Sequence, residues 1–262
     1  MRVRLVQGVL STARLARLVE EPVRFSLAQV RRESEPVAYH LRGSDVVIHL
    51  RHSTPDINSL EQIFRLGHYE MPPEVRRALA GVEPPLCVVD LGANVGLFAA
   101  YVRKRYGEAE ITAFEPDPGN AAVLRRSAET NPLPWKVVAA CADVRDGEVQ
   151  FAAGHFTNSR VETNGGGGTR PTPAVDVFRY LADVDLLKVD IEGSEWAILG
   201  DPRFGRVPAE VVALEYHAHL CPTDEPSALA HELLRRAGYE TAERQDFDAP
   251  PGHGMIWAWK AG

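Results

Sequence analysis

The sequence has no run of 18 apolar residues, so no segment is predicted to cross a membrane as a helix. Cysteine is scarce: the sequence has three, an odd number, at Cys87, Cys141 and Cys221. The first two lie in apolar runs, which favours buried, reduced thiols over disulfides and therefore a cytoplasmic location. Basic residues are also few, with 29 Lys and Arg against 36 Asp and Glu. This balance argues against nucleic acid as the main partner.

The most informative segment that is present reads VVDLGANVG and ends at Gly96. An apolar run that passes through Asp90 into Gly92 indicates a buried strand that turns tightly into a helix, the arrangement that binds nucleotide-like ligands. A second apolar run ends in Glu115, near the offset of about 20 residues at which an acidic side chain binds a ribose diol. A dinucleotide fingerprint needs glycine where Asn94 stands, so S-adenosylmethionine is the predicted cofactor.

Alternating strands and helices follow residue 86, and this pattern predicts an α/β protein with a doubly wound parallel sheet. The predicted strands are 86–91, 110–115, 135–141, 185–191, 210–216, 241–246 and 254–260. The predicted helices are 95–106, 118–130, 174–182, 194–200 and 226–237. No helix fits between the last two strands, so the last of the seven strands is expected to be antiparallel. This is the Rossmann-like sheet of class I methyltransferases.

Residues 1–81 are predicted to form an N-terminal accessory region, and residues 82–262 the cofactor-binding domain, with a linker at 81–85. The first 21 residues have partly helical apolar spacing, but Arg14 and Arg17 exclude a signal peptide. This segment is expected to pack on the core, cover the site or join a homodimer, and a helix on a membrane surface is the alternative. A β-hairpin at 37–50 and a helix from 57 to 66 capped by Asp56 follow, and then a helix that ends near residue 80.

Four segments resemble the FkbM family of S-adenosylmethionine-dependent methyltransferases. They read VDLGANVG at 89–96, FEPDP at 114–118, AACADVRDGEVQF at 139–151 and LLKVDIEGSEW at 186–196. The resemblance spans about residues 54–214, and the last segment is the most discriminating. It implies an enzyme that methylates a hydroxyl oxygen of a small molecule, commonly a sugar or secondary metabolite, as in natural-product tailoring. An NAD-dependent oxidoreductase and a cofactor-binding protein without turnover are the alternatives.

The resemblance also implies the residues that hold the cofactor. The methionine end is placed against Asp90, Gly92, Ala93, Asn94 and Gly96. Glu115 is expected to accept hydrogen bonds from the ribose hydroxyls. Pro116, Ala142 and Asp143 are placed at the adenine, with a turn role for Asp143 as the alternative.

The predicted chemistry lies at the carboxyl ends of the strands, where open α/β sheets bind their ligands. Asp190 closes the fourth strand, faces the methyl group or the acceptor hydroxyl, and is predicted to be catalytic together with Glu192. His217 is the preferred general base, because an imidazole titrates near working pH. Lys188 is expected to neutralise a buried carboxylate, and Glu195 to be a structural acid in the first turn of a helix.

A metal is the main alternative to direct deprotonation, since Asp190 and Glu215 could bind Mg²⁺ through oxygen ligands. The acceptor is expected to lie against the accessory region. The candidate lining residues there are Arg51, Asp56, His68 and Tyr69, with capping as the alternative for Asp56. The glycine-rich loop at 164–168 is either a lid or a tolerated surface insertion.

Overall fold

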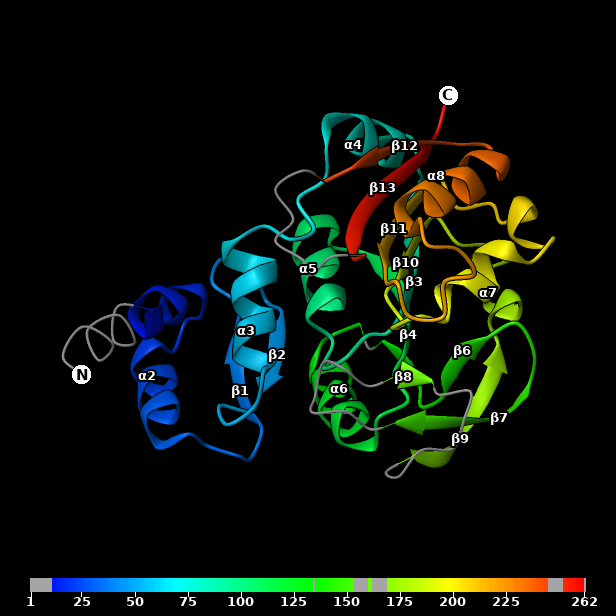
Figure 1. The fold of residues 1–262 in the computed structure, drawn as a ribbon. Coiled ribbons are helices and arrows are strands. Elements are labelled where there is room, and N and C mark those ends of the chain that lie inside the picture. The colour runs from blue at the N-terminus through cyan, green and yellow to red at the C-terminus, as the bar shows by residue number, and fades with distance from the viewer. Residues whose placement is uncertain (1–10, 134, 153–159, 162–168, 245–251, 262) are drawn as a thin grey trace.

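A seven-stranded sheet forms the centre of the computed structural model, which describes residues 11–133, 135–152, 160–161, 169–244 and 252–261 (Figure 1). Its spatial order is β12, β13, β11, β10, β3, β4, β5. The strands are β3 (Leu86–Leu91), β4 (Ala109–Phe114), β5 (Lys136–Val138), β10 (Leu186–Val189), β11 (Val211–Tyr216), β12 (Tyr239–Glu243) and β13 (Gly254–Lys260). In this order, the adjacent strands β11, β10, β3, β4 and β5 run parallel to one another. Strand β13 is antiparallel to both of its neighbours, β11 and β12. The predicted doubly wound sheet with a reversed last strand is confirmed.

Helices cover both faces of this sheet, which explains why β3, β10 and β11 are apolar almost throughout. The helices are α4 (Pro73–Ala80), α5 (Leu97–Tyr106) and α6 (Pro118–Thr130) on one face, and α7 (Glu195–Gly200) and α8 (Pro226–Arg236) on the other. Alternate residues of one strand therefore enter different cores: Val88 packs with the first group of helices and Val89 with the second. Within the described residues, no helix has the length and apolar content needed to span a membrane.

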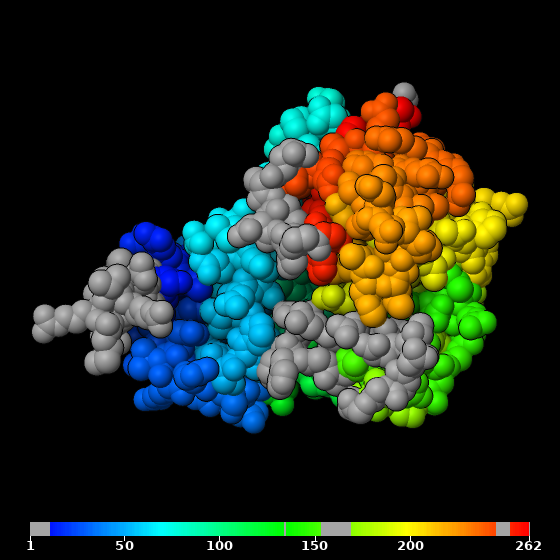
Figure 2. Space-filling view, in the orientation of Figure 1, coloured from blue at the N-terminus to red at the C-terminus, as the bar shows by residue number. Residues whose placement is uncertain are grey.

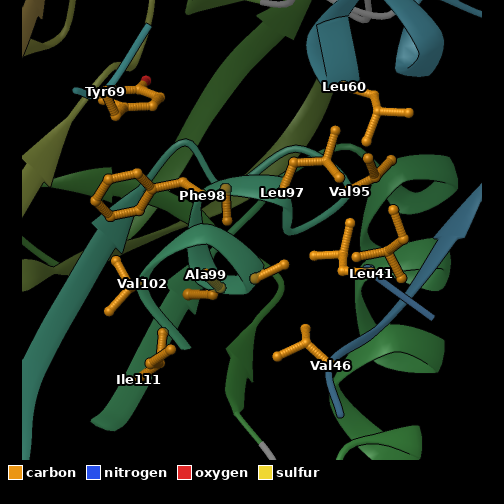
Figure 3. Close-up of a cluster of buried hydrophobic side chains, with 14 of the residues drawn as sticks. Leu41, Val46, Leu60, Tyr69, Val95, Leu97, Phe98, Ala99, Val102 and Ile111 are labelled. Atoms are coloured by element: carbon orange, nitrogen blue, oxygen red, sulfur yellow. The ribbon is translucent and has the colours of Figure 1, made fainter. Parts of the chain in front are cut away.

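The accessory region packs against the layer formed by α5 and α6 (Figure 1). Its elements are η1 (Ala16–Leu18), α2 (Pro22–Arg31), β1 (Val37–His40), β2 (Val47–Leu50), α3 (Asp56–Leu60) and the π-helical turn η2 (Glu61–Arg65). The predicted hairpin is confirmed, because β1 and β2 pair antiparallel. Figure 3 shows Leu41, Val46 and Leu60 in one apolar cluster with Val95 and Leu97 of the glycine turn and α5. The accessory region and the first helix of the cofactor-binding domain thus share a core.

Asp56 has a different role from the predicted helix cap. Its carboxylate accepts hydrogen bonds from the backbone N–H of Arg51 at 3.0 Å and from that guanidinium at 2.9 Å. The same guanidinium donates to Asn120 Oδ1 at 2.7 Å, and all three side chains are buried. Asp56 is engaged in this ion pair within the accessory region, and Arg51 extends the contact to α6 through Asn120. The residue at the helix N-terminus, Pro55, has no side-chain cap.

A second, four-stranded sheet was not predicted. Its strands are β6 (Cys141–Asp143), β7 (Gly147–Ala152), β8 (Arg160–Val161) and β9 (Thr169–Asp176), in the order β6, β9, β7, β8. The prediction of a helix at 174–182 is wrong, because β9 and the 3-10 turn η3 (Val177–Tyr180) occupy that segment. Ala174 pairs with both β6 and β7, and the next two residues pair with β6, so this backbone bonds between strands and not along a helix. The predicted strand 135–141 is divided between the two sheets.

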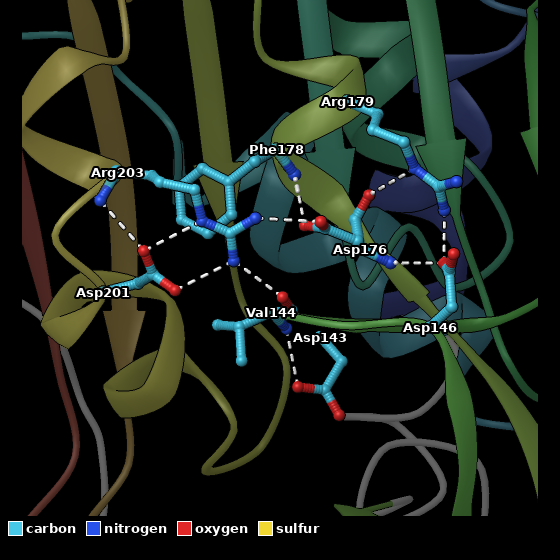
Figure 4. A network of polar contacts seen from close by, with 8 residues as sticks. All are labelled: Asp143, Val144, Asp146, Asp176, Phe178, Arg179, Asp201 and Arg203. Carbon is cyan, nitrogen blue, oxygen red and sulfur yellow. Dashed lines mark hydrogen bonds and ion pairs between the residues drawn. The ribbon is translucent and has the colours of Figure 1, made fainter.

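An exposed polar network joins the second sheet to the turn after α7 (Figure 4). Arg203 donates to the Val144 carbonyl at 2.6 Å, to Asp176 at 2.8 Å and to Asp201 at 2.9 Å. Its guanidinium also lies 4.1 Å from the ring centroid of Phe178. The glycine-rich loop at 164–168 and the first ten residues lie outside the described residues, so the predictions for them are untested.

Candidate active site

The glycine turn between β3 and α5 presses its backbone against the end of β10. Gly92 has φ 84°, and a Cβ there would lie 1.8 Å from the carbonyl oxygen of Asp190. Asn94 and Gly96 also have positive φ, 50° and 88°. The N–H groups of Gly92 and Ala93 donate to the Phe114 carbonyl, at 3.1 and 2.8 Å. The turn therefore depends on glycine for both its conformation and its contact with β10.

Beneath this turn lies a buried ion pair. Lys188 Nζ is 3.0 Å from Asp90 Oδ1 and 3.3 Å from Asp190 Oδ2, and it donates to the Gly92 carbonyl at 2.9 Å. Burial raises the pKa of Asp90, and the ammonium group opposes this rise. Burial lowers the pKa of Lys188, but the charges of Asp90 and Asp190 outweigh it and raise that pKa. The predicted role of Lys188 is confirmed: it neutralises a carboxylate that is fully buried.

Glu115 follows β4 and is nearly buried beside the turn. Its two carboxylate oxygens accept hydrogen bonds from the N–H groups of Asn94 and Asp117, both at 2.8 Å. Burial raises the pKa of Glu115 to about 7, although these hydrogen bonds oppose the rise. Each oxygen retains a lone pair for a ligand hydroxyl. The predicted ribose site is therefore geometrically available.

A cavity of about 620 Å³ runs along the carboxyl ends of the strands. Figure 2 shows the surface hollowed between the light-blue accessory region and the red and orange C-terminal elements. The predicted residues that line the cavity are Gly92, Ala93, Asn94, Glu115, Pro116, Ala142, Asp190, Glu192, Glu215, His68 and Tyr69. The predicted residues outside its lining are Asp90, Gly96, Asp143, His217, Arg51 and Asp56. Most of the predicted cofactor and catalytic residues thus meet in one cavity.

The turn after β10 holds two residues with positive φ, Glu192 at 54° and Gly193 at 107°. Glu195 stabilises this turn, because one of its oxygens accepts the N–H of Gly193 at 2.7 Å. The other oxygen accepts the N–H of His217 at 2.7 Å and contacts its Nδ1 at 3.0 Å. A wholly buried carboxylate therefore ties the end of β10 to the end of β11, consistent with the structural role predicted for it.

His217 lies behind the carboxylates rather than on the cavity wall. Its Nε2 is 3.6 Å from Glu192 Oε2 and 3.9 Å from Asp190 Oδ1. Burial lowers the pKa of His217, but the hydrogen bond to Glu195 and the nearby acidic charges raise it to about 10. The imidazole is therefore already protonated at neutral pH. This geometry does not suit the predicted role of direct general base, and burial raises the pKa of Glu192, which does line the cavity, to about 7.

The predicted metal site was tested against the same residues. Donor atoms of Asp190, Glu215 and His217 lie within 4.8 Å of one another. However, Lys188 binds the Asp190 carboxylate, and His68 Nε2 lies 3.2 Å from Glu215 Oε2. An ammonium group and an imidazole thus contact the two carboxylates that Mg²⁺ would need, and Mg²⁺ demands oxygen ligands in near-ideal octahedral geometry. The residues do not fit this ion, and we derive no step through a metal.

Sequence reasoning missed several residues at or beside the cavity. Phe151 lines the cavity from β7, and the Arg170 guanidinium of β9 lies 5.8 Å from its ring centroid. Arg244 and His253 line the cavity from the ends of β12 and β13. The motif AACADVRDGEVQF contains Phe151, but its position on a second sheet could not be read from the motif. Arg170, Arg244 and His253 lie in no motif that could have marked them in the sequence.

The affinity for S-adenosylmethionine is expected to depend on pH through Glu115. The predicted contact with the ribose hydroxyls uses the carboxylate form of Glu115, and the pKa near 7 in the free protein means that this carboxylate is protonated at lower pH. Affinity should therefore fall by up to about tenfold per pH unit below pH 7 and be level above it. Calorimetric titration at a series of pH values measures this profile. The Glu115→Gln variant should bind S-adenosylmethionine weakly, with an affinity that does not change with pH. If the variant and the unmodified protein showed the same pH profile, Glu115 would not be the ribose-binding group.

The chain is similar in sequence to known methyltransferases. The Methyltransferase FkbM domain model matches residues 90–241. Methyltransferase sdnD of Sordaria araneosa is 48% identical over 216 residues, covering 65% of this chain and 80% of that protein. Methyltransferase 1 of Beauveria bassiana is 28% identical over 199 residues, covering 63% of this chain and 76% of that protein.

Among solved structures, TYW2 of M. jannaschii in complex with AdoMet has a TM-score of 0.46 at 16% identity, covering 86% of this chain and 85% of that one. Precorrin-6y C5,15-methyltransferase of Geobacter metallireducens has a TM-score of 0.43 at 16% identity, covering 71% of this chain and 88% of that one. From its domain match and its methyltransferase relatives, this chain belongs to the FkbM family of S-adenosylmethionine-dependent methyltransferases.

Proposed function

We propose that the chain transfers the methyl group of S-adenosylmethionine to a hydroxyl oxygen of a small molecule. The observation that carries this proposal is one cavity in which the glycine turn and Glu115 adjoin three carboxylates, Asp190, Glu192 and Glu215. Carboxylates accept hydrogen bonds from a hydroxyl and can remove its proton. An O-methyltransferase needs this chemistry beside its cofactor.

The residues of the turn fit S-adenosylmethionine better than a dinucleotide. Gly92 lets the turn lie against the end of β10, where a Cβ would be 1.8 Å from the Asp190 carbonyl oxygen, and Glu115 offers two oxygens to a ribose diol. Asn94 stands where a pyrophosphate requires glycine, which disfavours the NAD-dependent alternative. When bound, S-adenosylmethionine supplies a methyl group on a positively charged sulfur that an oxygen nucleophile can attack.

The side chains around the acceptor take separate roles in this proposal. Asp190, ion-paired with Lys188, orients the hydroxyl by accepting its hydrogen bond. Glu192 takes the proton, because it lines the cavity and its pKa, raised by burial to about 7, suits a general base. His217, held by Glu195, places a positive charge behind both carboxylates. Positioning of the acceptor hydroxyl by these groups supplies much of the rate.

The proposal is tested by titrating the purified protein with S-adenosylmethionine and with NAD, and then by assaying S-adenosylhomocysteine release with a panel of hydroxylated acceptors. We expect binding of the methyl donor and a new methyl ether, detected by mass spectrometry, in at least one acceptor. Thiol and amine analogues of that acceptor are the controls for oxygen specificity. Methylation of an amine analogue alone, or binding of NAD alone, would overturn the proposal.

Metal removal is expected to leave the rate within about twofold of its starting value. Lys188 and His217 already place positive charge against Asp190, so the site gains little from a divalent cation. The measurement compares initial rates after dialysis against EDTA with rates after Mg²⁺ is restored. A loss of about tenfold or more that Mg²⁺ reverses would show instead that Asp190 and Glu215 are metal ligands.

A further inference from the structure

One wall of the cavity is formed by the end of the accessory region. Ser59, Gln62, Ile63 and Leu66 line the cavity from α3, η2 and the residue after it. The last three lie three, four and seven residues after Ser59, a spacing that places all four side chains on one helical face. The wall therefore belongs to the accessory region, which precedes the cofactor motifs in the chain, and it is separate from the residues predicted to hold S-adenosylmethionine.

This wall is fastened on the side of the cavity that lies away from the ribose site. His68 Nε2 contacts Glu215 Oε2 at 3.2 Å, at the end of β11. Arg244, at the end of β12, donates to the carbonyl oxygens of Gly67 and His68. Since β11 and β4 lie on opposite sides of β10 and β3 in the sheet, the end of the wall at His68 is next to Glu215 and on the other side of β10 and β3 from Glu115. That is where an acceptor belongs.

The wall offers apolar surface to a ligand. Leu66 is 54% exposed, and among the large apolar side chains found exposed in the described residues it is the one that lines the cavity. Ile63 lines the cavity in the preceding turn and is partly buried against the main core. Exposed leucine at the edge of a cavity is stabilised when an apolar ligand covers it.

The charges near this wall disfavour an anionic acceptor. Three carboxylates, Asp190, Glu192 and Glu215, line the cavity here. The nearby cations already contact protein groups: Lys188 binds Asp90, Asp190 and the Gly92 carbonyl, and Arg244 binds two backbone carbonyls. The imidazolium of His217, outside the cavity lining, lies against Glu195, Glu192 and Asp190. A carboxylate or phosphate on the acceptor beside the reacting hydroxyl would therefore meet like charge.

We propose that the acceptor is an uncharged alcohol with an apolar body, which lies against Ile63 and Leu66 while its hydroxyl reaches Asp190 and Glu192. The identity of the hydroxyl as the reacting group rests on the proposed function, whereas binding of the apolar body does not. Substrate selection is thereby assigned to the accessory region, and cofactor binding to the glycine turn and Glu115.

The test measures binding of three probes to the full chain by calorimetry without any methyl donor. The probes are 1,2-octanediol, 1,2-butanediol and 2-hydroxyoctanoate. Each added methylene should tighten binding by up to about fourfold, so the octanediol is expected to bind at least about tenfold more tightly than the butanediol. It should also bind at least about tenfold more tightly than the hydroxyoctanoate, which has the same chain length but carries a carboxylate beside its hydroxyl.

Leu66→Asp places a charge on the wall, and Leu133→Asp is its matched control because Leu133 is 50% exposed and outside the cavity lining. We expect Leu66→Asp to weaken octanediol binding at least about tenfold while its affinity for S-adenosylmethionine is unchanged, which also shows that the variant is folded. Leu133→Asp should change neither. Equal binding of octanediol to both variants, or tighter binding of the hydroxyoctanoate, would overturn the proposal.

Methyl transfer to the octanediol is then measured separately. Binding that is lost in Leu66→Asp but without methylation of any alcohol would support the apolar wall and contradict the proposed function. Methylation of small polar alcohols with no preference for chain length would support the proposed function and contradict the apolar wall. The two proposals therefore fail in distinguishable ways.

Discussion

Lys188→Met is expected to lower the free energy of unfolding by about 3–5 kcal/mol, the usual cost of removing one partner from a buried ion pair. Lys188 is 3% exposed and Asp90 0% exposed, so the carboxylate left behind would be shielded from bulk water. Burial already raises the pKa of Asp90, and without Lys188 this carboxyl must stay unpaired or become protonated. The Gly92 carbonyl would also lose its hydrogen bond from Nζ.

Urea unfolding followed by circular dichroism measures this loss. The double variant Asp90→Asn/Lys188→Met removes both charges and should recover most of the lost stability, which separates the charge effect from the change in packing. Lys136→Met is the surface control, because Lys136 is exposed, and it should cost less than about 1 kcal/mol. A loss below about 1 kcal/mol in Lys188→Met would mean that the pair contributes little to the fold.

Glu192→Gln is expected to lower kcat by about 10²–10⁴-fold, the contribution typical of a general base. Glutamine keeps the length and shape of the side chain in a turn where φ is 54°, so the conformation should be retained. Affinity for S-adenosylmethionine should change little, because Glu115 and the glycine turn are untouched. Stopped-time assays of methyl transfer at saturating acceptor measure the effect.

His217→Gln provides the comparison that identifies the base. In the proposed arrangement His217 acts through the carboxylates, so its loss should reduce kcat less than the loss of Glu192. If His217→Gln abolishes turnover while Glu192→Gln retains most of it, the general base is His217, as the sequence alone predicted. Glu195→Gln should resemble His217→Gln, because Glu195 holds the ring through Nδ1.

Local signals in the sequence were sufficient where an element is determined by residues close in the chain. The glycine turn follows from Gly92 and Gly96, whose positive φ only glycine adopts without strain. The seven strands, the helices that connect them apart from the one wrongly predicted at 174–182, and the reversed last strand follow from apolar runs and loop lengths. Glu115 was found because it ends a strand at a defined offset from the turn, and Lys188 because it alternates with Asp190.

The remaining features depend on contacts between segments that are distant in the sequence. The second sheet escaped prediction because β9 takes its partners from β6 and β7, not from its own neighbours. The placement of His217 depends on Glu195, 22 residues earlier, and the wall at Leu66 depends on the reach of His68 to Glu215. By itself the sequence determined the sheet, the cofactor turn and the family. Only the tertiary structure decided which groups line the cavity and with what pKa, because burial and neighbouring charge depend on contacts between distant segments.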